Sequence, residues 1–95
     1  MPRISDWPSS RRPRERLLTE GVAALSDAEL LAVCLRTGVA GKNAVVLAQD
    51  LLDQFNGLHG LTRASQRAAC AALGLGPAKW ALLQAASELV RRSLK

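Results

Sequence analysis

The stretch LGLGPAK, residues 73–79, lies between two helical patterns and decides how the last third of this chain folds. Glycine at positions 74 and 76 permits backbone angles that a Cβ would forbid, and it leaves the amide N–H groups uncovered. Pro77 suits the first position of a helix, where no N–H is needed. Because partial positive charge collects at a helix start, a bulky anion can approach those amides. The stretch therefore predicts either a phosphate-binding turn or a plain corner between two helices.

The candidate DNA-binding residues of this turn are Gly74, Leu75, Gly76, Ala78 and Lys79. Leu75 is expected to point inward and anchor the turn to the core. Lys79, one helical turn further on, is expected to reach the same or the next phosphate as a flexible cation.

The composition of the chain favours helices throughout. Its 95 residues include 16 Ala and 17 Leu, against one Phe, two Trp and no Tyr. Ala and Leu are strong helix formers, whereas sheets prefer branched and aromatic side chains. This excludes a sandwich, a barrel or a doubly wound sheet, and the apolar content of 48% excludes disorder. We expect an all-α domain, a small bundle of about five short helices.

Local patterns place these helices. Residues 1–10 are expected to be extended and residues 11–95 to form the helical domain. Ser10 is expected to cap the first helix, which buries Leu17 and Leu18, and Ser26 with Glu29 forms a capping box that starts the second. The helices are predicted at residues 11–20, 27–37 (ended by Gly38), 42–55, 66–72 (capped by Ser65) and 77–94, with a short helical turn at 58–64. The last is expected to bury Leu82, Leu83, Ala86, Leu89 and Val90.

Positive charge is concentrated near the N-terminus. The chain carries a formal net charge of +5, and a cluster of arginines falls within its first sixteen residues: Arg11, Arg12, Arg14 and Arg16. Such a cluster can track a phosphate backbone, so Arg11, Arg12 and Arg14 are further candidates for DNA binding. It can equally be a solvated helix face paired with Glu15 and Glu20, or a surface that holds another domain. Other bases, among them Arg36 and Lys42, are interpreted as ordinary surface.

Several other classes of function find no support. No apolar run approaches the roughly 18–20 residues of a membrane helix, and the N-terminus lacks a signal core, so we expect a cytoplasmic protein without membrane contact. Cys34 and Cys70 are interpreted as small buried side chains. His59 is interpreted as a turn residue. With no Ser–His–Asp set and no metal ligands, we expect no enzyme, no catalytic residue, no metal site and no cofactor.

A family resemblance rests on longer strings. GLGPAK at 74–79 resembles the helix-hairpin-helix motif of DNA repair and recombination proteins, here spanning residues 65–94. RPRERLL at 12–18, ALSDAELLA at 24–32 and LRTG at 35–38 resemble the N-terminal domain of the bacterial RadC family, over essentially all 95 residues. Two positions depart from the hairpin motif: Leu73 replaces a common proline, and Trp80 replaces a small residue where the two helices touch.

The resemblance implies sequence-independent binding of DNA through backbone phosphates, as part of a DNA repair protein. It also implies a possible monovalent cation on the carbonyls of the hairpin. RadC-like proteins usually continue into a domain resembling the JAB1/MPN metalloproteins, whose zinc pattern needs two closely spaced histidines. This chain has one histidine, so that domain is expected to be absent here. The alternative function is a protein-interaction domain that positions such a metal-dependent partner domain.

Overall fold

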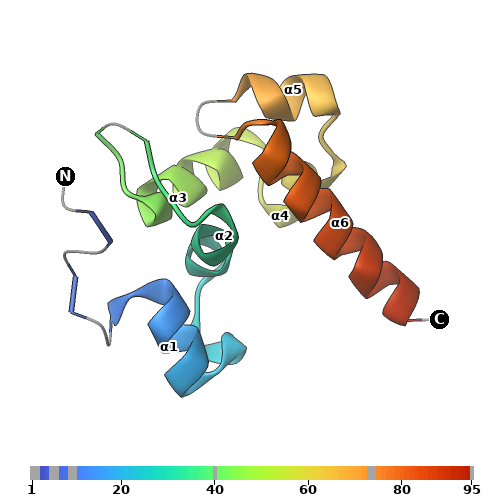
Figure 1. The fold of residues 1–95 in the computed structure, drawn as a ribbon. Coiled ribbons are helices and arrows are strands. Elements are labelled where there is room, and N and C mark those ends of the chain that lie inside the picture. The colour runs from blue at the N-terminus through green and yellow to red at the C-terminus, as the bar shows by residue number, and fades with distance from the viewer. Residues whose placement is uncertain (1–2, 5–6, 9–10, 40, 73–74, 95) are drawn as a thin grey trace.

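The computed structural model describes residues 3–4, 7–8, 11–39, 41–72 and 75–94. Within these ranges the chain is all-helical, as predicted (Figure 1). It forms α1 (Pro13–Glu20), a 3-10 turn η3 (Val22–Ala24), α2 (Asp27–Leu35), α3 (Ala44–Gln54), α4 (Leu58–Arg63), α5 (Gln66–Ala71) and α6 (Pro77–Ser93). In the described ranges, no helix is both long enough and apolar enough to span a membrane.

Helix α1 is shorter than predicted. It begins at Pro13 after Arg12, with no side chain capping its first turn; the expected cap, Ser10, lies outside the described residues. The helix ends at Gly21, whose φ of +90° suits glycine. The prediction that Leu18 is buried is wrong, because 73% of this side chain is exposed. Leu17 is half-buried, and the residue that α1 buries is Pro13.

Helix α2 begins as predicted and ends early. The Ser26 hydroxyl accepts a hydrogen bond from the Glu29 amide, and the Glu29 carboxylate accepts one from the Ser26 amide, which completes the capping box. The helix ends at Leu35 rather than near Thr37, because Arg36 takes a φ of +69° and turns the chain. Gly38 belongs to the next turn, where a Cβ would lie 2.1 Å from the carbonyl oxygen of Lys42.

The core lies mainly between α2 and α3. Asn43 caps α3 by accepting a hydrogen bond from the Val46 amide at 3.0 Å. The buried residues of α3 recur at three- and four-residue spacing along one helix face. Each buried leucine contributes about 1.5–3 kcal/mol. The core cluster consists of Ala28, Leu31, Ala32, Leu35, Ala44, Leu47, Ala48, Leu51, Leu52, Leu61, Ala69, Ala72 and Leu75.

The prediction that α6 buries an apolar face is wrong. None of its residues is buried, and Leu82, Leu89 and Val90 are 48%, 69% and 59% exposed. Of its large side chains, Trp80 and Leu83 pack against the core. Figure 1 shows the reason: α6 starts beside α5 and then runs away from the other helices. Only its first half therefore has a surface to pack on.

Candidate nucleic-acid interface

The corner between α5 and α6 is attached to the core through the side chain of Leu75. Leu75 is only 1% exposed and sits in the core cluster, as predicted. Its amide donates to the Ala72 carbonyl oxygen at 3.2 Å, which draws the chain back over the end of α5. Helix α6 then starts at Pro77, with Gly76 as its N-cap. The candidate DNA-binding residue Gly74, and Leu73 before it, lie outside the described ranges. We call the described part, residues 75–79, the corner.

The backbone of the corner is open at Gly76. A Cβ built on Gly76 would meet no heavy atom within 4 Å. No side chain caps α6, and among the described residues nothing accepts a hydrogen bond from the amides of Gly76, Ala78 or Lys79. Three N–H groups at a helix start thus have no partner among the described residues, which is the arrangement that favours an anion.

Trp80 does not cover this corner. Its indole packs against the core cluster and is partly buried. The ring nitrogen Nε1 is buried and finds no acceptor among the described residues. The large side chain is thus accommodated against the core, and none of its atoms comes within 4 Å of a Cβ built on Gly76.

Lys79 makes a contact that the sequence did not indicate. Its Nζ donates to the carbonyl oxygen and to the hydroxyl of Thr37, both at 3.2 Å. The side chain is half-buried, and it ties the start of α6 to the turn that follows α2. Its positive charge remains beside the corner, but a phosphate at Gly76 has to share this ammonium with Thr37.

Three of the N-terminal arginines, Arg11, Arg12 and Arg14, lie at the surface. Arg11 and Arg14 are exposed, and Arg12 is half-buried with its Nε donating to the Trp7 carbonyl oxygen at 3.0 Å. Arg14 lies 3.7 Å from the Glu15 carboxylate. In the described ranges Arg11 forms no ion pair. These three candidates are therefore on the surface, near the start of α1.

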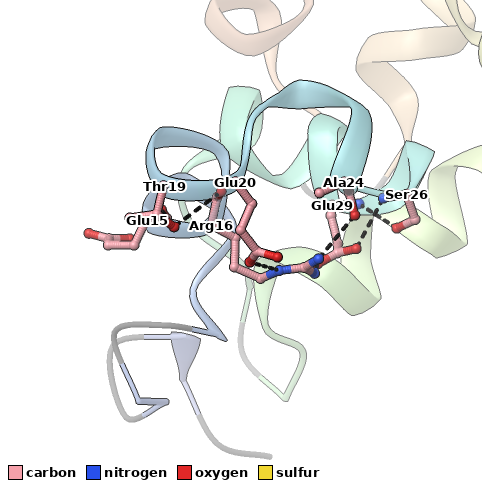
Figure 2. Close-up of polar contacts among 7 residues, drawn as sticks. All are labelled: Glu15, Arg16, Thr19, Glu20, Ala24, Ser26 and Glu29. Atoms are coloured by element: carbon pink, nitrogen blue, oxygen red, sulfur yellow. Dashed lines mark hydrogen bonds and ion pairs between the residues drawn. The ribbon is translucent and has the colours of Figure 1, made fainter.

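Arg16 belongs to the internal framework of the domain. Figure 2 shows its guanidinium between three acceptors: the carboxylates of Glu20 and Glu29 and the carbonyl oxygen of Ala24, the last at 3.0 Å. Hydrogen bonding to the Ser26 amide, with Arg16 adding to it, holds the pKa of Glu29 below its ordinary value. This network joins α1 to the start of α2, so Arg16 is occupied within the fold.

Arg36 connects the arginines of α1 with the corner. Arg12, Arg14, Arg36 and Thr37 line one surface pocket of about 530 Å³. Thr37 is also the residue that holds Lys79. Arg36 is exposed, as the sequence indicated, but the sequence did not indicate that it lines a pocket with Arg14. The available signal was the LRTG string, which follows α2 directly.

The described residues offer no obvious metal site. No group of three His, Cys, Asp or Glu side chains among them converges on one point. His59 is exposed on α4 rather than in a turn, and Cys34 and Cys70 are unbonded and half-buried. The monovalent cation expected on the hairpin carbonyls stays a prediction, because part of the hairpin lies outside the described ranges.

Comparisons with known proteins give a family. The model of the family described as UPF0758 N-terminal matches residues 4–81. The UPF0758 protein of Thiobacillus denitrificans is 62% identical over 91 residues, which are 96% of this chain and 41% of that protein. The UPF0758 protein of Pseudomonas syringae pv. tomato is 63% identical over the same shares. The chain thus spans about two fifths of the length of these curated relatives. No solved structure matches it.

Proposed function

This chain belongs to the UPF0758 N-terminal family, and we propose that it binds DNA without sequence preference, through backbone phosphates at the corner between α5 and α6. The observation that carries the proposal is the open backbone at Gly76, whose surroundings leave room for an approaching group. The amides of Ala78 and Lys79, which have no partner among the described residues, follow it in the chain, and the Lys79 ammonium is hydrogen-bonded to Thr37. An oxyanion is the ligand that suits such donors.

The position of the bases supports a nucleic acid rather than a small anion. Arg14 and Arg36 line a pocket that reaches Thr37, the partner of Lys79. Contacts to backbone phosphates position a protein on DNA and carry no sequence information. With no base-reading side chain at the corner, binding is expected to be insensitive to sequence. We propose further that the chain is the N-terminal module of a RadC-like DNA repair protein, as its motifs suggest.

The direct test is a titration of a labelled duplex and a branched DNA with this domain. If the domain contacts about two to four phosphates, the logarithm of the binding constant should fall with the logarithm of the salt concentration at a slope of roughly −2 to −4. The dissociation constant is expected in the range of about 10⁻⁴–10⁻⁶ M, typical of non-specific contacts. Absence of binding to either DNA at 50 mM salt would rule the proposal out.

Gly76→Glu tests whether the corner is the binding site. A carboxylate placed there fills the open space and repels phosphate, so affinity should fall at least fivefold. Ser93→Glu is the matched control, because it makes the same change in net charge at the far end of α6, about 24 Å away along the helix. Circular dichroism checks that both variants fold. If folded Gly76→Glu binds as tightly as Ser93→Glu, the corner is not the site.

The alternative function, a protein-interaction domain that positions a metal-dependent partner domain, is favoured by one observation. Helix α6 exposes Leu82 in its first half and Leu89 and Val90 in its second half, and Leu94, which follows the helix, is exposed as well. Apolar side chains gathered on one helix are typical of a surface that contacts another protein. This function replaces DNA binding if neither DNA binds and if Leu89→Lys weakens the association of this domain with the remainder of a longer relative, supplied as a separate protein.

A further inference from the structure

The turn after α2 holds its backbone in an unusual shape. Arg36 has a φ of +69° and a ψ of −45°. The Thr37 amide donates to the Leu35 carbonyl oxygen at 2.8 Å, across Arg36, while the Arg36 amide still bonds to Ala32. This is a γ-turn of the strained form, which is rare for residues other than glycine. Such strain persists only where the surroundings impose it, and it is concentrated at ligand-binding positions. We call Leu35–Thr37 the Arg36 turn.

Two sets of contacts hold the Arg36 turn in place. On one side, Lys79 donates to both oxygens of Thr37. On the other side, the chain folds back at Gly38, and Val39 and Lys42 exchange two backbone hydrogen bonds of 3.0 Å. The Arg36 side chain itself is exposed, and among the described residues it forms no hydrogen bond or ion pair. The backbone is thus fixed while the guanidinium is presented outward.

Arg36 stands at the junction of two pockets. The pocket of about 530 Å³ is lined by both Arg36 and Arg14. A second pocket of about 470 Å³ is lined by Arg36, Thr37 and Lys42. The carboxylates here are already engaged: Asp50 lies 2.5 Å from Lys42, and Glu15 lies 3.7 Å from Arg14. The positive charges of Arg36 and Lys79 have no carboxylate partner in the described ranges.

We infer that the Arg36 turn is a second phosphate contact, over which a DNA backbone held at Gly76 continues toward Arg14. The guanidinium of arginine offers a planar pair of donors that matches a phosphate group. The turn and the corner are joined directly by the Lys79–Thr37 hydrogen bonds, so one strand can touch both. This inference rests on the proposed function and names the residue that extends its site.

Arg36→Asn tests the inference with little risk to the fold. Asparagine tolerates a positive φ better than most residues, so the backbone is kept while the charge is lost. Arg92→Gln is the matched control, because it removes one positive charge from the far end of α6. Titration of a duplex should show affinity reduced by about three- to tenfold for Arg36→Asn, with the salt slope smaller by about 0.9. Arg92→Gln should match the wild type.

The outcomes separate the two proposals. If the wild type binds no DNA, the proposed function fails and this inference fails with it. If the wild type binds and Gly76→Glu weakens binding, but Arg36→Asn has an unchanged affinity and salt slope, only the inference is overturned. An equal loss in Arg92→Gln also overturns it, because the effect is then one of net charge.

A second readout distinguishes DNA from free phosphate. Amide NMR shifts of Thr37 and Gly38 are followed during addition of a duplex, and separately of inorganic phosphate at matched ionic strength. Saturating shifts with the duplex, and none with millimolar phosphate, support the inference. Saturation by phosphate alone at the same amides would mean an adventitious anion site, and it would overturn the assignment to a DNA backbone.

Discussion

Replacing Glu29 with glutamine removes one negative charge from the first turn of α2 and leaves the shape of the side chain unchanged. One carboxylate oxygen accepts from the Ser26 amide at 3.0 Å, and the other accepts from Arg16. Glutamine also closes a capping box, so the bond to Ser26 can survive. What is lost is the attraction of the carboxylate to the helix start, about 0.3–1 kcal/mol, and its pairing with Arg16. We expect a total loss of about 1 kcal/mol, or about 4–8 °C in Tm.

Glu29→Ala removes the hydrogen bond to Ser26 as well, so its cost should rise to about 2 kcal/mol. The pH dependence separates charge from shape. The pKa of Glu29 is lower in the folded chain than in the unfolded chain, chiefly because of the Ser26 amide. Its charge therefore stabilises the fold above the unfolded pKa of about 4.3, and this contribution is lost as pH falls through the folded pKa.

Urea unfolding of the wild type and Glu29→Gln from pH 7 down to pH 3 measures this effect. The difference in unfolding free energy should be full at pH 7 and shrink progressively between about pH 5 and pH 3. A difference that stays constant over this range, or is absent at pH 7, would refute the role given to the carboxylate.

Two further predictions concern packing. A Cβ at Gly60 would lie 1.6 Å from the Phe55 carbonyl oxygen, so Gly60→Ala should lower the stability by more than about 3 kcal/mol. A Cβ at Gly76 would meet no atom within 4 Å. Gly76→Ala should therefore change the stability, measured by thermal melting, by less than about 0.5 kcal/mol, since a poorer N-cap is offset by a less flexible unfolded chain. Equal melting temperatures for the two would contradict this account. Trp80→Phe removes the unpaired indole N–H, so it should change stability by less than about 1 kcal/mol, whereas Trp80→Ala should cost about 2 kcal/mol or more. A loss for phenylalanine as large as that for alanine would show that Nε1 has a partner.

Local signals in the sequence were sufficient for the helices. The capping box at Ser26 and the cap at Ser65 each act within one helical turn, and both are confirmed. Apolar spacing alone does not reveal whether a partner surface exists. For this reason the spacing predicts that Leu18 and Leu89 are buried, whereas they are 73% and 69% exposed.

The candidate site was predictable only in part. Glycine and proline at 76 and 77 indicate an open helix start, and the structure has one. The bond between Lys79 and Thr37 joins residues 42 positions apart, so no local pattern contains it. The positive φ of Arg36 is also imposed from outside, because an arginine does not favour that region by itself.

Helix α6 contacts the rest of the domain mainly through its first half. In this half, Trp80 and Leu83 pack against the core cluster, and Gln84 donates a hydrogen bond to the Thr62 carbonyl oxygen. In the second half of α6, Arg91 and Arg92 donate hydrogen bonds to the Glu88 carboxylate, within the same helix. Because the described residues make no core contact with the second half of α6, its turns can open without disturbing the contacts of the first half. The second half of α6 can therefore change its position relative to the core while the contacts of the first half stay in place.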